Sequence, residues 1–432
     1  MSDSMRGGAR LAVEPSKSRL AGILGPGLIT GAADDDPSGI ATYTQTGAQL
    51  GYAVGWTLLF SYPLMVAIQI ISARIGRTTG AGIAGNLRKF YPNWIVYTGI
   101  LLLLAANTLN LGADIGAMAE AVRILVGGPQ VAYVLAFGTI CAALQIFLAY
   151  RRYVTVLKWL TLALFAYVAT LFYAGVDWRA LALGLVVPHV SFSADYLTAI
   201  VAILGTTISP YLFFWQASQE VEDTKTMPER KPLKRAPEQA PNANERIEMD
   251  TCLGMGFSNG VSLAIMATAA ATLNVAGTKS VHTAAEAALA LRPLAGPFAE
   301  TLFALGIVGT GLLAVPALAG SAAYGVCEAF RWPTGLDRAP KRAKAFYGTI
   351  AAATAAGAVL NFTPIDPIQA LFWCAVVNGV VAVPIMAIMM MMAANPKVMG
   401  AFAIGLPLKI LGWLSTVAMA LAAVGMIVLN FA

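Results

Sequence analysis

The chain has 432 residues, of which 58% are hydrophobic and only 12% are charged. Soluble globular domains carry about 25% charged residues, so this composition excludes that class and indicates a polytopic membrane protein. The formal net charge is +6. Because the positive charges gather in loops on one side of the predicted spans, we expect the partner to be a lipid bilayer and not a nucleic acid.

Apolar runs of about 20 residues, enough to cross a bilayer, predict eleven transmembrane helices. The predicted spans are residues 20–47, 52–73, 94–124, 131–150, 153–175, 196–218, 250–274, 298–329, 345–361, 366–394 and 402–430. The polar and basic tail at 1–19 lacks the signature of a removable signal peptide. Most of the 28 Lys and Arg fall in this tail and in the loops on the same side, which predicts a cytoplasmic N-terminus for a multi-pass protein of the cell (inner) membrane.

The longest polar stretch, residues 219–249, joins the sixth and seventh spans. Its Pro, Glu and Lys content predicts a mobile cytoplasmic linker. The chain has only two His and four Cys, none at metal-ligand spacing, and no nucleophile with a histidine base. We therefore expect no enzyme activity, no catalytic residues and no cofactor.

Two spans are interrupted near their middles. The first contains three consecutive carboxylates, Asp34, Asp35 and Asp36, followed by Pro37, and the sixth contains GTTISP with Pro210. Proline removes a backbone donor and breaks a helix. The breaks lie five spans apart, as expected for two inverted five-helix repeats with a site at the membrane midplane. The repeats are predicted at 20–175 and 196–394, with an additional eleventh helix at 402–430.

Carboxylates within a bilayer cost about 2.5–3.5 kcal/mol on insertion scales, so they indicate function. Asp36 also has the pattern of a helix N-cap, which leaves Asp34 and Asp35 unexplained. A bound cation would explain them, because unwound backbone frees carbonyl oxygens. No Cys, His or Met occurs at 34–45 or 203–216, so these breaks favour a hard ion over transition metals.

At this point the chain resembles the natural resistance-associated macrophage protein (NRAMP) family of divalent-metal transporters, from about residue 22 to 395. The resemblance rests on GPG near the start of span one, the DPSG break, the GTTISP break and ALGIVGTGLLAVPALAGSAAYGVCEAF in span eight. It implies an all-α, leucine-transporter-like fold with discontinuous helices one and six.

The resemblance implies that Asp36 binds the metal and that the backbone carbonyl of Thr206 joins the coordination. Gly39 stands where the family has a metal-binding asparagine, and Ser209 where it has a metal-binding methionine. Losing the thioether moves the chain towards the family's magnesium-transporting branch. Ser209 is also explained by helix packing.

Three further residues belong to the predicted metal site or its surroundings. Gln369 resembles a glutamine that approaches the ion in the family, and interhelical hydrogen bonding explains it equally well. We expect Asp35, together with Asp34, to attract a hydrated ion through its waters. Magnesium or manganese is then a transported substrate.

A candidate coupling or ion path comprises Asp34, Asp114 and Tyr211. Tyr211 stands where the family often has a histidine, and Asn110 replaces the first of two acidic positions. We therefore expect transport by alternating access with weak or no proton coupling. The alternatives are a proton-coupled manganese or iron importer, an organic-solute transporter of the same fold, and a metal sensor. No obligatory protein partner is expected.

Overall fold

The computed structural model describes residues 26–147, 164–227 and 229–431. The predicted tail at 1–19, the start of the first span and residues 153–163 of the fifth span lie outside this range. Every regular element among the described residues is a helix or a helical turn, and none is a strand. This confirms the all-α prediction.

Long helices coincide with every predicted span except the fifth. They are α2 (Pro26–Asp34) with α3 (Pro37–Leu50), α4 (Gly55–Thr79), α6 (Asn93–Val126), α7 (Gln130–Phe147), α11 (Ala194–Thr207) with α12 (Pro210–Thr226), α13 (Ala240–Ala269), α16 (Ala299–Ala329), α17 (Lys344–Leu360), α18 (Pro367–Ala393) and α20 (Leu406–Phe431). Eight described helical stretches are long and apolar enough to cross a membrane. The count of eleven stays a prediction.

Short helices and turns connect the long ones. The short α-helices are α5 (Ile83–Phe90), α9 (Phe165–Thr170), α10 (Trp178–Val186), α14 (Ala284–Ala288), α15 (Arg292–Ala295) and α19 (Pro396–Met399). The 3-10 turns are η1 (Gly51–Val54), η3 (Pro237–Gln239), η5 (Leu289–Leu291), η6 (Gly296–Phe298), η7 (Pro340–Arg342) and η8 (Gly400–Phe402), and η4 (Ala270–Asn274) is a π-helical turn that prolongs α13.

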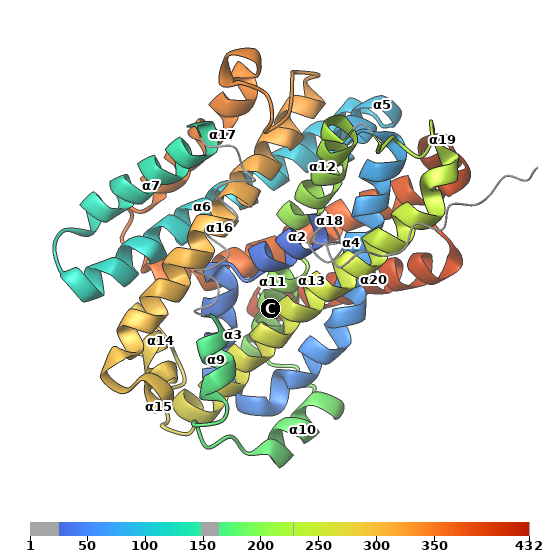
Figure 1. Ribbon diagram of the computed structural model, residues 1–432. Coiled ribbons are helices and arrows are strands. Elements are labelled where there is room, and N and C mark those ends of the chain that lie inside the picture. The colour runs from blue at the N-terminus through green and yellow to red at the C-terminus, as the bar shows by residue number, and fades with distance from the viewer. Residues whose placement is uncertain (1–25, 148–163, 228, 432) are drawn as a thin grey trace, which may run out of the picture.

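Two broken helices lie at the centre of the bundle (Figure 1). The half-helices α2 and α3 pack against α13, while α11 packs against α18. Glycines permit these close crossings. A Cβ atom on Gly31 of α2 would lie 2.3 Å from the Gly254 carbonyl oxygen of α13, and one on Gly205 of α11 would lie 2.5 Å from the Gly379 nitrogen of α18. Small residues at these crossings let helix backbones touch, as is common in membrane bundles.

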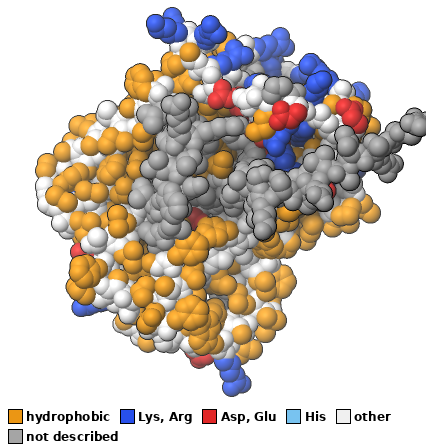
Figure 2. Space-filling model, in the orientation of Figure 1, with side chains coloured by type: hydrophobic (Ala, Val, Ile, Leu, Met, Phe, Trp, Pro, Cys, Tyr) orange, Lys and Arg blue, Asp and Glu red, His pale blue; other side chains and the backbone are white. Residues whose placement is uncertain are grey.

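The outer surface agrees with a position in a bilayer. Hydrophobic side chains cover much of the face seen in Figure 2, and Lys and Arg gather at one end of the molecule, near α12 and α17. Large apolar side chains are exposed around the bundle, with Phe147 at 79% and Leu421 at 69% exposure. Lipid chains are the natural neighbours of such a surface, so this is an integral multi-pass membrane protein.

The segment predicted as a mobile linker, 219–249, differs from that expectation. Helices α12 and α13 extend into it from both ends, and the Leu233 N–H donates to the Arg77 carbonyl of α4 at 3.1 Å. Arg246 pairs with Glu220 at 2.5 Å. The expectation from composition counts the charges as solvated, whereas here charges of opposite sign pair within the segment.

Candidate functional site

The first span is broken between α2 and α3. Pro37, the first residue of α3, forces the residue before it out of the helical region, and Asp36 accordingly has φ −71° and ψ 170°. One oxygen of Asp36, Oδ1, accepts the Gly39 N–H at 2.8 Å and the Ser38 hydroxyl at 2.6 Å. Asp36 is therefore the N-cap of α3, as the DPSG motif indicates.

The sixth span is broken by the same device. Pro210 begins α12, and Ser209 before it is extended, with φ −78° and ψ 136°. The Ser209 side chain does not cap α12. Its hydroxyl turns back to α11, where it lies 2.6 Å from the Gly205 carbonyl oxygen and 3.1 Å from that of Thr206. The end of α11 thus presents a hydroxyl and carbonyl oxygens together.

The two breaks contact each other. A Cβ atom on Gly39 would lie only 3.2 Å from the Thr206 hydroxyl, so glycine at this position lets α3 approach α11. Tyr211, in the first turn of α12, donates its hydroxyl to the Ala33 carbonyl at 2.8 Å and lies 3.4 Å from Oδ2 of Asp36. The structure therefore brings Asp36, Gly39, Thr206 and Tyr211 into one place.

Helix α6 completes the surroundings of Asp36. Asn110 donates its side-chain amide to Oδ2 of Asp36 at 3.0 Å. One turn further on, Asp114 is fully buried, and neither of its carboxylate oxygens has a hydrogen-bond partner among the described residues. An unpartnered buried acid is costly to keep, which makes Asp114 a functional candidate beside Asp36.

Asp34 and Asp35 face a different helix. The Ser258 hydroxyl of α13 lies 2.6 Å from Oδ2 of Asp34 and 3.1 Å from Oδ1 of Asp35. Each carboxylate keeps one oxygen that no described group contacts by a hydrogen bond. The three acids do not converge, and the described residues contain no group of three or more His, Cys, Asp or Glu placed to hold a metal ion. The break therefore offers one carboxylate, Asp36, with neutral oxygens around it.

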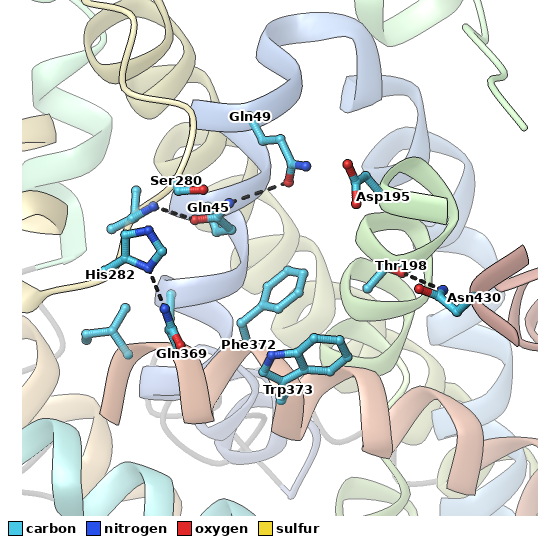
Figure 3. Close-up of a pocket in the computed structure, with 13 residues that line it drawn as sticks. Gln45, Gln49, Asp195, Thr198, Ser280, His282, Gln369, Phe372, Trp373 and Asn430 are labelled. Atoms are coloured by element: carbon cyan, nitrogen blue, oxygen red, sulfur yellow. Dashed lines mark hydrogen bonds between the residues drawn. The ribbon is translucent and has the colours of Figure 1, made fainter. Parts of the chain in front are cut away.

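Gln369 lies apart from this cluster, in a pocket of about 330 Å³. Its side-chain amide contacts the His282 ring, and the Gln45 side chain of α3 accepts the Val281 N–H at 2.7 Å on the neighbouring wall (Figure 3). Among the described residues no hydrogen bond joins Gln369 to Asp36. Ala41 of α3 lines the same pocket. The pocket therefore lies along α3, on the part of the chain that follows Asp36, whereas α2 precedes Asp36.

The cap of α18 sets the position of Gln369. Asp366, which precedes α18, accepts the Ile368 N–H at 2.9 Å. At the break between α2 and α3, Asp36 is only 1% exposed, so this site is closed to solvent in the described conformation.

Sequence reasoning missed two contacts of the first span. Ser258 was not singled out, and neither was Asp250, whose Oδ2 accepts the Gly27 N–H at the start of α2 at 2.7 Å. Both residues lie on α13, more than 220 positions along the chain from their partners. The only signal was that polar residues interrupt an otherwise apolar span.

The fold and the site define a multi-pass membrane protein built around two discontinuous helices, with a buried carboxylate where they meet. A sequence model described as natural resistance-associated macrophage protein-like matches residues 27–429. The chain belongs to this family, as its motifs predicted.

Individual relatives agree with this assignment. The chain is 29% identical over 302 residues to a protein of Pectobacterium carotovorum named divalent metal cation transporter MntH, covering 67% of this chain and 68% of that protein. A protein of the same name from Yersinia pestis is 27% identical over 304 residues, with the same coverage of both chains.

Solved structures confirm the fold. A manganese transporter of Eremococcus coleocola superposes with a TM-score of 0.73 at 17% identity, covering 97% of this chain and 88% of that one. A nucleobase-cation-symport-1 family transporter superposes with a TM-score of 0.59 at 15% identity, covering 94% and 90%. These likenesses establish the leucine-transporter-like architecture predicted from the two broken helices.

Proposed function

We propose that this protein carries divalent metal cations across the cell (inner) membrane, and that magnesium is its main substrate, with manganese also carried. The observation that supports this most is Asp36, a single carboxylate at the meeting point of two broken helices, which accepts hydrogen bonds from two hydroxyls and the side-chain amide nitrogen of Asn110. Carbonyl oxygens of α11 lie at the second break. Relatives are named divalent metal cation transporters, and a structural neighbour is a manganese transporter.

The preference for magnesium is argued from the ligand types. Thioether and imidazole ligands favour transition metals, whereas carboxylate, carbonyl and water suit magnesium. At the two breaks, Ser209 offers only a hydroxyl and Gly39 has no side chain, so neither supplies a soft ligand. Magnesium keeps several waters and binds through one or two carboxylates. In this proposal Asp36 contacts the ion, the Thr206 carbonyl and Ser209 hydroxyl complete its surroundings, and Asp34 and Asp35 attract it through water.

We further propose that transport is uncoupled from protons. Tyr211 contacts Asp36 where a proton-carrying histidine would be needed, and a phenol, with an ordinary pKa of about 10, does not exchange protons readily near neutral pH. Proton-coupled transport remains the second candidate because one observation favours it: Asp114 is a buried acid without a described partner.

Alternating access would move the half-helices of both breaks. The Thr30 hydroxyl of α2 contacts the Gln216 amide of α12, and Asp250 of α13 holds the Gly27 N–H of α2. These contacts close the end of the site that faces the Lys- and Arg-rich surface. In the proposed cycle they break when the inverted repeats, 20–175 and 196–394, rock against each other.

The experiment is uptake by proteoliposomes containing Asp36→Asn. Asparagine still caps a helix but removes the charge, so we expect magnesium and manganese uptake to fall to the level of empty vesicles while the protein remains folded. Asp177→Asn is the matched control, because Asp177 caps α10 by accepting the Ala180 N–H at 2.9 Å. Uptake by the Asp36 variant at the parent rate would remove the basis of the proposal.

A further inference from the structure

A second pocket, of about 450 Å³, lies at the Lys- and Arg-rich end of the molecule, between α5, α12 and the end of α16. Three separate elements supply the cationic side chains that line it: Arg88 and Lys89 from α5, Lys225 from α12 and Arg331 from the chain after α16. The one carboxylate lining this pocket is Glu328. Positive charge therefore exceeds negative charge at its wall.

Both carboxylate oxygens of Glu328 accept hydrogen bonds from backbone N–H groups. Its Oε1 accepts the Gly82 N–H at 3.0 Å and its Oε2 accepts the Gly85 N–H at 2.9 Å. These N–H groups lie at the start of α5, where the first backbone donors of a helix have no partner within the helix. Lys225 lies 3.3 Å from Glu222, but its side chain is still 42% exposed. The described residues therefore leave the guanidinium of Arg331 and the ammonium of Lys225 accessible from the pocket.

Arg331 occupies a backbone position that favours glycine. Its φ is +59°, and it is the single non-glycine residue with positive φ in the described part of the chain. Its N–H donates to the Glu328 carbonyl at 3.2 Å, and the Trp332 N–H donates to the Cys327 carbonyl at 2.8 Å. This is the Schellman end of α16, in which glycine usually takes the left-handed residue. Arginine in this conformation lowers the stability of the folded protein, which indicates that its side chain has a function.

Aromatic rings beside Arg331 place the pocket at the membrane surface. Phe330 and Trp332 stack with ring centres 4.9 Å apart, and Tyr97 lies 5.6 Å from Phe330. All three are between 41% and 49% exposed. Trp and Tyr gather at the level of the lipid head groups, so the mouth of this cationic pocket lies where lipid phosphates are found.

We propose that this pocket binds the phosphate group of an anionic phospholipid. Arg331 and Lys225 contact the phosphate, Arg88 and Lys89 supply further positive charge, and Phe330 and Trp332 lie along the lipid chains. A guanidinium matches phosphate geometry with two parallel donors, and basic pockets between transmembrane helices bind anionic head groups. The site is separate from Asp36 and does not depend on the transported ion.

The test measures lipid binding to the full chain in detergent by native mass spectrometry, with phosphatidylglycerol compared with phosphatidylcholine. We expect phosphatidylglycerol to bind more tightly, and Lys225→Gln/Arg331→Gln to weaken its binding about 25-fold, since each Lys or Arg near an anionic surface contributes about fivefold. The control Lys341→Gln/Arg342→Gln removes two exposed charges from the same end, outside the pocket, and is expected to retain the preference. Equal loss in both double variants would contradict a specific site.

Two further arms separate the alternatives. Inorganic phosphate and ATP are added as soluble competitors, and if they displace phosphatidylglycerol completely at millimolar concentration, the pocket is a soluble-phosphate site and the lipid assignment is wrong. Arg331→Gly suits the backbone better than arginine, so we expect an equal or higher unfolding temperature together with about fivefold weaker phosphatidylglycerol binding. Unchanged binding in this variant would overturn the proposal.

Discussion

The helix break and the N-cap at Asp36 could be identified from the sequence, because the residues that determine them are its neighbours in the chain. A carboxylate before proline in an apolar span predicts both a helix break and an N-cap, and the structure confirms both. The partners of the neighbouring acids could not be predicted in the same way. Ser258 meets Asp34 and Asp35 only through the packing of α13 on α2, and a single sequence does not specify how two helices are rotated against each other.

The identity of residue 209 is expected to control ion preference. Ser209→Cys places a soft ligand at the second break with almost no change in volume, so cadmium and manganese should compete with magnesium about tenfold better than in the parent, or ~1.4 kcal/mol. Competition is measured by uptake into proteoliposomes. Ser415→Cys on α20 changes a similarly buried serine outside the site. If both variants leave ion preference unaltered, Ser209 does not face the ion.

At the scale of elements, both breaks were predictable because proline acts on the residue before it. Asp36 and Ser209 are extended for the same reason. The contacts of the segment 219–249 could not be predicted, because they include a partner elsewhere, the Arg77 carbonyl of α4, and an ion pair within the segment, that of Arg246 with Glu220. The amino-acid composition of the segment indicates that it is polar, and it contains no information about those contacts.

The crossing of α11 and α18 is expected to depend on glycine. A Cβ on Gly205 would meet the Ala375 carbonyl oxygen at 2.0 Å, so Gly205→Ala should separate the helices and destabilise the protein by about 1–3 kcal/mol. Gly99→Ala on α6 is the control, because no atom beyond its own stretch of helix backbone lies within 4 Å of its added Cβ, and alanine should stabilise that helix by up to about 1 kcal/mol. Unfolding temperatures in detergent compare the two. Similar shifts in both would contradict the close crossing.

At the scale of the whole molecule, the membrane class and the family followed from composition and motifs, and the superpositions confirm the fold. Which end faces the cytoplasm was predicted from the distribution of Lys and Arg. The structure gathers these charges at one end, but contacts within a protein do not determine which compartment that end faces.

Cysteine labelling tests the orientation. In a Cys252→Ser background, Lys279→Cys should react with a membrane-impermeant maleimide in intact cells, whereas Lys341→Cys should react only after lysis. Both lysines are exposed. The reverse pattern would invert the orientation and place the Lys- and Arg-rich end outside.

The most direct test of the central claim is ion uptake into proteoliposomes at a fixed membrane potential, with magnesium, manganese and calcium compared and internal pH recorded at the same time. The account predicts magnesium uptake that is driven by its gradient and the potential and causes no acidification inside. Manganese uptake with acidification and no magnesium uptake would contradict it, and would assign Asp114 to a proton path in a coupled transition-metal importer.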